Sequence, residues 1–227
     1  KAGILSLEDK DPKKAEQFLR ETLKSSTNPA FKAQAQVALI LKAYERKDYK
    51  GVTELFKLAP LASKDDSVKS QIEMMVANAW RFQENHREAL LAYAKVAREY
   101  PKEKESTEAG YRKLQCFHTL GDKQLAPEVD KYVATESAKD PETSFIDLAL
   151  LLKAEVLFAA KNYKGAAESY RNVRPAKINK QYVPMRLYKM GWAMTEAGED
   201  VNGVEALGEF ISNWPKDPLV PSALIKR

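Results

Sequence analysis

The sequence predicts an all-α protein built as a right-handed solenoid of helix-turn-helix repeats. Six short residues recur at intervals of 37, 37, 37, 40 and 37 residues, namely Ala15, Val52, Ala89, Ala126, Ala166 and Gly203. A period of about 20–50 residues with self-similar content is typical of repeat architectures. No segment shows the sustained alternation of apolar and polar residues that is typical of a strand. Together these observations favour stacked helical hairpins.

Capping residues and prolines locate the helix ends. Four pairs supply a side-chain cap followed by proline at the first helical position, namely Asp11-Pro12, Asn28-Pro29, Asp140-Pro141 and Asp217-Pro218. Second helices have candidate caps at Asp48, Asn85 and Asn162, and glycines suited to the turns after first helices stand at Gly121 and Gly198. The expected helices are 12–25, 29–46, 48–60, 65–84, 86–99, 103–120, 122–138, 141–160, 162–173, 181–198, 200–213 and 218 onward.

Each period has the same internal pattern. A first helix carries a bulky and a small residue, and a second helix carries a small residue with an aromatic one four positions later. Around Ala89 these positions are Ala77, Trp80, Tyr93 and Val96. The pattern resembles the tetratricopeptide repeat over nearly the whole chain. The resemblance implies a single array, 1–227, with a partial repeat 1–25, repeats 29–60, 65–101, 103–138, 141–175 and 181–215, and the start of a truncated repeat 218–227.

Small residues on paired helices allow the helices to approach closely. Three small residues of first helices are expected to face three of second helices, the pairs being Ala77 with Ala89, Ala154 with Ala166, and Gly191 with Gly203. The unit around Ala126 is expected to be the weakest, because Asp130 stands where other units carry an aromatic residue.

Composition sets broad limits on the protein. The formal charge of +5 is modest for 227 residues, and the single cysteine, Cys116, excludes an internal disulfide framework. No apolar run reaches about 18 residues, so no transmembrane helix is predicted. The start at Lys1, and the apolar Leu219, Val220, Leu224 and Ile225 near the other end, favour a fragment of a longer array.

Two junctions carry a narrower resemblance. The segment 93–117 has a second helix that ends in Tyr100-Pro101, a short polar bridge and then Glu108-Ala109-Gly110-Tyr111, and 214–224 repeats this punctuation. It resembles repeats of bacterial cell-envelope proteins, namely the periplasmic coordinator of the Tol–Pal system and the lipoprotein of the outer-membrane β-barrel assembly machine. The resemblance implies a periplasmic or envelope-associated scaffold. A cytoplasmic location is the alternative, since such junctions occur in cytoplasmic arrays too.

First helices line the concave face with which such solenoids bind peptides. The repeat frame places on this face Val37, Leu41, Tyr44, Met74, Asn78, Arg81, Tyr111, Gln115, His118, Leu151, Glu155, Phe158, Tyr188, Trp192 and Thr195. An apolar stripe with a few polar groups suits an extended or helical peptide. The alternative is that the long first helices bury these side chains against their neighbours.

A carboxylate clamp for C-terminal tails is a well-known use of this fold. Asn78 and Arg112 stand at clamp-like positions, but Val37 and Leu41 replace the lysine and the second asparagine that a clamp needs. The sequence therefore argues against a chaperone-tail receptor.

One stretch is purely basic. Between Glu168 and Glu196 there is no acidic residue, and six cations fall inside it, namely Arg171, Arg174, Lys177, Lys180, Arg186 and Lys189. Helix-dipole stabilisation accounts for Arg171 and Arg174. The others leave open an anionic partner, such as an acidic protein or phospholipid headgroups. Nucleic acid is not favoured, because no recognised binding motif accompanies the charge.

Catalysis finds no support in the sequence. Cys116 and His118 are two positions apart, so their side chains diverge by about 200° on a helix. His86 stands where other repeats carry a turn-packing tyrosine. No metal-ligand spacing and no glycine-rich phosphate loop is present, so we expect no enzyme activity, no cofactor, no metal and no small-molecule substrate.

Three functional hypotheses remain. The leading one is a non-catalytic scaffold that binds a protein or peptide along the concave face, in a bacterial envelope complex. The second is an oligomerisation or spacer module whose terminal helices stack end to end. The third is a binder of an anionic partner through 171–189.

Overall fold

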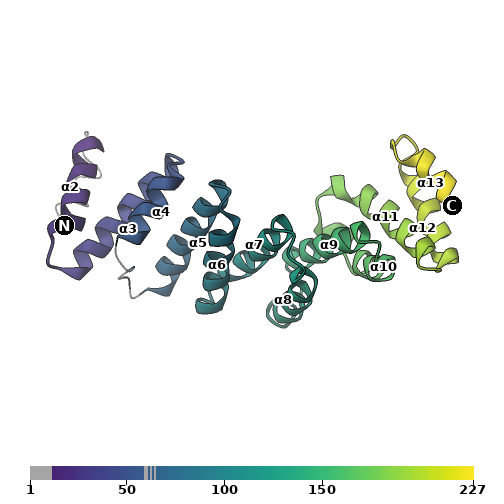
Figure 1. Cartoon of the computed structure of the whole chain (residues 1–227), viewed down its shortest axis with the longest axis horizontal. Helices are drawn as coiled ribbons and strands as arrows, with labels where there is room; N and C mark the ends of the chain where they lie inside the picture. Colours follow the sequence, from purple (N-terminus) through teal and green to yellow (C-terminus); the bar gives the residue numbers. More distant parts are fainter. Residues whose placement is uncertain (1–11, 59–60, 62, 64) are drawn as a thin grey trace. The chain divides into compact units, whose positions relative to one another are not determined.

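The computed structural model describes residues 12–58, 61, 63 and 65–227. Over these residues the chain forms twelve α-helices and two short 3₁₀ helices, and no strand (Figure 1). The helices are α2 (Pro12–Ser25), α3 (Pro29–Glu45), α4 (Tyr49–Lys57), α5 (Asp66–Phe82), α6 (His86–Glu99), α7 (Glu105–Thr119), α8 (Leu125–Lys139), α9 (Ser144–Ala159), α10 (Tyr163–Arg171), η1 (Pro175–Lys177), η2 (Lys180–Tyr182), α11 (Val183–Glu196), α12 (Asp200–Asn213) and α13 (Val220–Lys226).

The helices fall into two compact units, Lys1–Cys116 and Phe117–Arg227. Within each unit, helices that follow one another in sequence pack together, as α5 and α6 do in the first unit and α11 and α12 in the second. First helices of successive repeats also touch, since α3 contacts α5 and α9 contacts α11. This is the stacking of helical hairpins that an all-α repeat solenoid requires. A single array running through both units stays a prediction.

Most predicted caps are present. Asn28 accepts a hydrogen bond from the N–H of Ala30, Asp48 from that of Gly51, and Asn162 from that of Gly165. Asn85 precedes α6 as predicted but makes no side-chain cap bond. Asp11 lies outside the described residues.

The helices predicted to start at Pro141 and Pro218 begin three and two residues later, at Ser144 and Val220. Asp140 and Asp217 accept hydrogen bonds from the backbone N–H groups of Glu142 and Leu219, so each begins a turn that precedes a helix. Helix α9 begins at Ser144, and the side chain of Thr143 caps it instead. An Asp-Pro pair suits either a turn or a helix start, and only the chain around it decides which.

One turn position recurs with left-handed backbone in every described repeat. The residue has a φ of 59° to 82°, and the residues are Lys47, Glu84, Gly121, Lys161 and Gly198. Left-handed geometry at the end of a helix suits glycine, as predicted for Gly121 and Gly198. The other three positions hold the same geometry without glycine, so the hairpin turn is dictated by the packing of the two helices.

The predicted close approach of helices is confirmed at α11 and α12. A Cβ on Gly203 would lie 2.5 Å from Cγ2 of Thr195 and 2.9 Å from the carbonyl oxygen of Gly191. A Cβ on Gly191 would lie 2.9 Å from Cγ of Leu207. The two glycines therefore let the helix backbones touch. In the other repeats, Ala77, Ala89, Ala154 and Ala166 are completely buried.

The weak repeat was assigned to the wrong helix face. In α8 the buried apolar residues are Leu125, Val129 and Tyr132, one position before the predicted frame of Ala126, Asp130 and Val133. Asp130 faces solvent and pairs with Lys153 of α9, with 2.5 Å between Oδ1 and Nζ. It therefore leaves no hole where an aromatic ring is missing. The interval that follows this repeat is 40 residues instead of 37, so the spacing did not show that the buried positions of α8 lie one residue earlier than predicted.

Candidate partner-binding surface

In the first unit, the first helices of the repeats are α3, α5 and α7, and the surface that they form is called the first-helix face here. This face holds a network of hydrogen-bonded polar side chains. The hydroxyl of Tyr93, on α6, donates to Oδ1 of Asn78, on α5, at 2.6 Å. Arg81 donates from Nε to the same hydroxyl at 3.3 Å, and Tyr44 of α3 lies near Asn78. The Tyr93 hydroxyl thus links α6 to two side chains of α5.

Burial keeps both phenols of this network neutral. It raises the pKa of Tyr93 to about 12, against the opposing effect of Arg81, and it raises the pKa of Tyr44 as well. Near neutral pH both hydroxyl groups are therefore hydrogen-bond donors. Both phenols therefore keep their protons over the physiological pH range.

Helix α7 adds a second polar group to the first unit. Arg112 donates from Nε and Nη2 to Oε1 of Glu108 and from Nη1 to Oε1 of Gln115. Gln115 in turn donates to the hydroxyl of Tyr111 at 3.2 Å. The basic residue that stands at a clamp-like position is thus engaged by its own helix.

Half-exposed aromatic rings lie beside this network. Tyr49 stacks on Phe82 with ring centroids 4.5 Å apart, and it meets Tyr44 edge-on at 5.9 Å. The guanidinium of Arg81 lies over the ring of Phe82 at 4.4 Å. Phe82 and Leu41 keep 46% and 37% of their surface exposed. Tyr49 and Phe82 were not among the predicted binding residues; their positions at the start of α4 and the end of α5 place each beside a hairpin turn.

In the second unit, Glu155 is the centre of the corresponding face. The hydroxyl of Tyr170 donates to its Oε1 at 2.7 Å, and Lys189 of α11 binds its Oε2. The Lys189 ammonium also lies 5.4 Å from the ring centre of Phe158, which Tyr163 meets edge-on. Lys189, predicted as part of a separate basic patch, thus belongs to the first-helix face.

Helix α13 approaches part of this face. Tyr188 and Trp192 of α11 are edge-on neighbours, 5.7 Å apart. The ammonium of Lys226 lies 5.5 Å from the Trp192 ring and pairs with Glu196. The α11 segment of the predicted groove is therefore partly occupied by the chain's own last helix.

Several predicted binding residues are packing residues. Met74, Tyr111 and Tyr188 keep only 7 to 9% of their surface exposed, and Met74 and Tyr188 lie in the hydrophobic clusters of their units. Val37 and Leu151 are partly buried against the same kind of cluster. The alternative of burial therefore applies to these positions, where second-helix residues such as Phe210, beside Tyr188, contribute to the packing.

Much of the predicted basic stretch is neutralised within the chain. Asp147, completely buried on α9, accepts hydrogen bonds from the backbone N–H of Arg174 and from its guanidinium, the shortest at 2.7 Å. Lys177 pairs with Glu142 at 2.9 Å, and Arg171 pairs with Glu199 at 2.5 Å. These acids lie 27 to 35 residues away in sequence, so the local charge pattern did not reveal them.

The remaining cations divide between core and surface. Arg186 is 7% exposed and donates from Nε to the carbonyl oxygen of Tyr170, so it is a core residue and not part of a surface patch. Lys180 is exposed. The stretch therefore offers little unpaired positive charge to an anionic partner.

Cys116 and His118 do not come together in the structure, and the described residues form no cluster of metal-ligating side chains. Cys116 is buried, while His118, two residues on, is exposed. No helix among the described residues has both the length and the apolar character needed to cross a bilayer.

Comparison with known proteins agrees with the helical hairpins. The family model of the tetratricopeptide repeat matches residues 187–217, which comprise most of α11 and all of α12. The chain carries a tetratricopeptide repeat. The matched segment contains the Gly191–Gly203 contact described above.

Solved structures extend the repeat fold beyond the matched segment. The MamA protein aligns with a TM-score of 0.59 and 14% identity over 81% of this chain and 92% of its own. PilW, described as a widely conserved type IV pilus biogenesis factor, aligns with a TM-score of 0.51 and 14% identity over 98% and 95%. At this identity the likeness shows the fold alone, an all-α repeat solenoid. No curated protein sequence matches the chain.

Proposed function

We propose that this protein is a non-catalytic scaffold that binds a protein or peptide partner through its first-helix faces. The observation that carries the proposal is the mixed surface of the first unit, where exposed Leu41 and Phe82 lie beside the fixed polar groups of Asn78 and Arg81. Peptide-binding surfaces combine apolar contact area with a few positioned polar groups. Groups that are already held in place lose little conformational entropy on binding.

The second unit supports the same proposal with different chemistry. Glu155 and Lys189 form an ion pair beside the half-buried ring of Phe158. Such a pair offers both an acceptor and a donor to a peptide backbone, and Phe158 offers apolar contact. Each unit therefore has its own candidate surface, and the partner need not contact both.

We further propose a bacterial envelope complex as the setting. The support is the junction pattern around Tyr100-Pro101 and Trp214-Pro215 and the fold shared with a type IV pilus biogenesis factor. Fractionation of the source cells, with an antibody to the natural protein, tests this location. Recovery in the cytoplasmic fraction would contradict it.

A photo-crosslinking experiment tests the binding surface. A photoreactive phenylalanine analogue replaces Leu41 or Phe158, or Leu91 of α6 as the control, because Leu91 is 62% exposed on a second helix. The same partner, identified by mass spectrometry, should be captured at 41 or 158 but not at 91. The purified partner should then lose at least about tenfold in affinity for Leu41→Glu and none for Leu91→Glu. Equal loss in both variants would refute the assignment.

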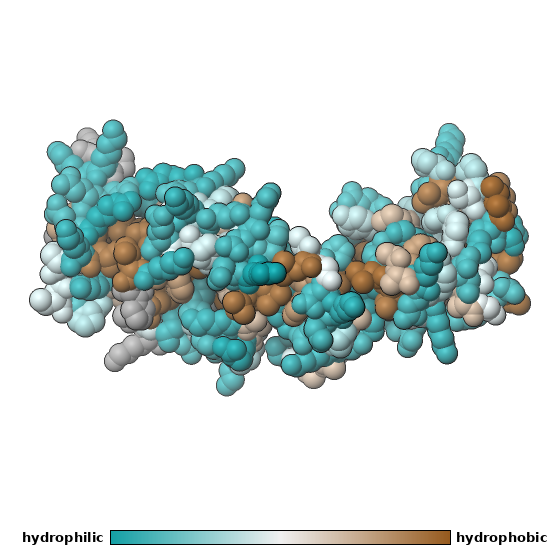
Figure 2. Space-filling model, in the orientation of Figure 1, coloured by the Kyte–Doolittle hydropathy of each residue, from teal (hydrophilic) through white to brown (hydrophobic). Residues whose placement is uncertain are grey.

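Self-association through α13 is a second candidate function. Leu224 and Ile225 of α13 keep 57% and 90% of their surface exposed, and Figure 2 shows hydrophobic atoms over this helix. Leu219 and Val220, also predicted to be uncovered, instead pack against the core of the second unit. Light scattering over a range of concentrations tests this candidate. A dimer that Ile225→Lys converts to a monomer would favour it over the scaffold.

A further inference from the structure

Arg81 carries a charge that the repeat fold does not require. It is the last but one residue of α5 and lies on the first-helix face of the first unit. The equivalent residues of the other repeats, at steps of 37 or 40 positions, are Tyr44, His118, Phe158 and Thr195. None of them is a lysine or an arginine, so the packing of helical hairpins does not call for a permanent cation here.

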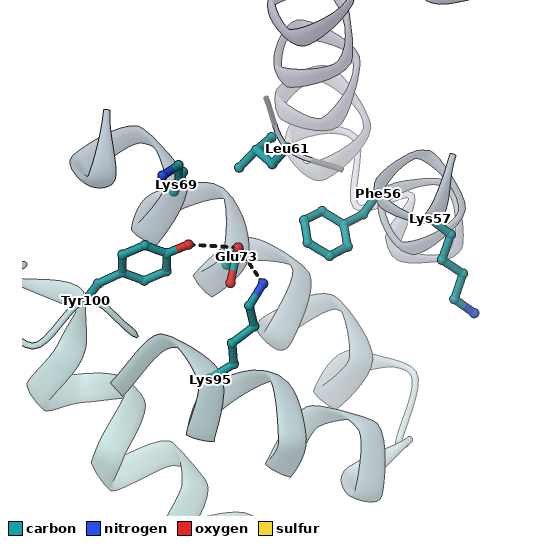
Figure 3. Close-up of a pocket in the computed structure, with 7 residues that line it drawn as sticks. All are labelled: Phe56, Lys57, Leu61, Lys69, Glu73, Lys95 and Tyr100. Atoms are coloured by element: carbon teal, nitrogen blue, oxygen red, sulfur yellow. Dashed lines mark hydrogen bonds and ion pairs between the residues drawn. The ribbon is translucent and has the colours of Figure 1, made fainter. Parts of the chain in front are cut away.

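Other cations of the first unit form ion pairs within the chain. In the pocket of Figure 3, Lys95 of α6 pairs with Glu73 of α5 at 2.8 Å. On α7, Arg112 pairs with Glu108 at 2.9 Å. By contrast, no carboxylate among the described residues forms an ion pair with Arg81. Its charge is therefore available to a partner.

The guanidinium of Arg81 is held at two points. Its Nε donates to the hydroxyl of Tyr93 at 3.3 Å, and its Cζ lies 4.4 Å from the ring centre of Phe82. The Phe82 ring in turn stacks on Tyr49 with 4.5 Å between the ring centroids. Because the group is already oriented, it loses little conformational freedom when a ligand binds.

The other end of the guanidinium is open. Among the described residues, Nη1 and Nη2 of Arg81 have no hydrogen-bond acceptor. Both atoms keep accessible surface, because the one fully buried side-chain nitrogen or oxygen without a hydrogen-bond partner in the described part of the chain is Oε2 of Glu73. A guanidinium donates and never accepts. The two Nη groups therefore offer a fork of N–H donors to an acceptor of a partner.

The geometry and charge of this fork fit a carboxylate. Two Nη groups donate in parallel to the two oxygens of a carboxylate, and these charge-assisted bonds are stronger than bonds to a neutral carbonyl. A phosphate group carries about 1.5 to 2 negative charges, whereas one guanidinium supplies a single positive charge. The match in charge therefore favours a carboxylate.

Apolar surface on two helices indicates that this carboxylate belongs to a side chain within a peptide. Phe82 of α5 keeps 46% of its surface exposed, and Leu41 of the neighbouring α3 keeps 37%. A peptide that continues on both sides of an acidic residue can contact both groups. A C-terminal carboxylate would need a further cation or amide on α3, where Val37 and Leu41 stand instead.

We propose that Arg81 binds the side-chain carboxylate of an aspartate or a glutamate in the protein partner, while apolar residues beside that acid contact Leu41 and Phe82. This assignment rests on the scaffold function proposed above, because it names the chemistry that the first-helix face of the first unit recognises. The scaffold thus selects an acidic residue flanked by apolar ones.

Four pentapeptides with leucine on each side of the central residue test the proposal. Three are acetylated and amidated and have glutamate, glutamine or lysine at the centre, and the fourth has central glutamine and a free C-terminal carboxylate. The readout is the change in NMR chemical shifts of Phe82 and of the Nε–H group of Arg81 during titration of the whole chain. The glutamate peptide should bind with a Kd of about 1 mM, and the others at least about fivefold more weakly. Raising the salt concentration from about 50 to 500 mM should remove most of this preference.

Variants locate the effect at the guanidinium. Arg81→Gln removes the charge and the fork, so it should abolish the preference for glutamate. Arg87→Gln, at an exposed arginine of α6, is the matched control and should change nothing. Leu41→Ala should weaken all four peptides and keep the preference. If Arg81→Gln does not fold, the peptide comparison on the natural chain and on Leu41→Ala decides.

Equal binding of the glutamate and glutamine peptides to the natural chain would overturn the proposal. So would shifts that fall away from Arg81 and Phe82, or no binding up to about 10 mM. Tighter binding of the peptide with the free terminus would overturn it in favour of C-terminal tails. Peptides that bind this face without a preference for acid would leave the scaffold function standing, so the two failures are distinguishable.

Discussion

The hydroxyl of Tyr170 donates to Oε1 of Glu155 at 2.7 Å, which fixes a charged group of a first helix from the helix behind it. The same relationship occurs 77 residues earlier, where Tyr93 donates to Asn78 at 2.6 Å. Both tyrosines are completely buried. The aromatic residue that fills the space between paired helices therefore also positions the polar group that faces a partner.

Replacing Tyr170 with phenylalanine should separate these two roles. Tyr170→Phe keeps the buried ring but removes the donor to Glu155, so we expect a loss of about 1 kcal/mol in the free energy of unfolding. Tyr182→Phe, at an exposed ring, is the control and should be neutral. Urea denaturation measures both. If Tyr170→Phe left the free energy of unfolding unchanged, the hydroxyl would orient Glu155 without stabilising the fold.

Because α11 and α12 approach closely, alanine should destabilise the fold at Gly203 but not at Gly208. Gly203→Ala places a Cβ 2.5 Å from Thr195, so overpacking should cost about 1–3 kcal/mol. On the same helix, a Cβ at Gly208 has no atom nearer than 3.6 Å, and alanine there should stabilise the helix by about 0.5–1 kcal/mol. Thermal melting of the two variants should therefore shift in opposite directions. Shifts in the same direction would contradict the close approach.

The buried ion pair of the second unit should be sensitive to loss of its exposed partner. Arg174→Ala leaves Asp147 charged and completely buried, with the backbone N–H of residue 174 as its remaining partner. Removing one partner of a buried pair costs about 3 kcal/mol or more. Lys177→Ala, which breaks the neighbouring pair with exposed Glu142, is the control and should have little effect. Denaturant midpoints measure both, and similar midpoints would rule out a structural role for Arg174.

Acid should weaken the contact between α2 and the end of α3. Hydrogen bonds from Arg46 and Arg20 lower the pKa of Glu16 to about 2. A lowered pKa means that the carboxylate stabilises the fold above its unfolded value, near 4.5, and loses this effect as the pH falls toward 2. The stability difference between the natural chain and Glu16→Gln should therefore be constant from pH 7 to 5 and decrease below about pH 4.5. A difference that is independent of pH would contradict the pairing.

Cys116 should be unreactive in the folded chain. Burial raises the pKa of its thiol to about 11, whereas an unperturbed thiol has a pKa of about 8.5. Labelling with a disulfide reagent at pH 8 should therefore be slow in buffer and rapid in denaturing urea. Rapid labelling in buffer would show that α7 opens at this position.

Much of the local structure follows from the sequence because it depends on residues close together in the chain. The cap at Asn28, the turns at Gly121 and Gly198, and the 37-residue period all depend on interactions within a few residues or within one hairpin. One kind of error occurred where the same residues suit either a turn or a helix start, as at Asp140-Pro141. The other occurred where the repeat interval changes from 37 to 40 residues, before Ala166. There the packing of α8 and α9 decided the helix face.

The candidate sites depended on tertiary structure. The sequence placed Asn78, Glu155 and Phe158 on the correct helices, but it could not show that Tyr93 and Tyr170 hold the first two in place, since each tyrosine is fifteen residues away. It presented Arg174 and Lys177 as a basic patch, because their acidic partners approach only when the helices stack. The unsatisfied oxygen of Glu73 was likewise invisible.

The sequence by itself determined the all-α repeat fold, since helix periodicity, caps and the spacing of small residues are local and recur. Tertiary structure alone decided which charges are neutralised, which first-helix side chains stay exposed and where a buried acceptor is left over. Those properties depend on desolvation and on partners about 15 to 35 residues apart, so they exist only once the hairpins pack.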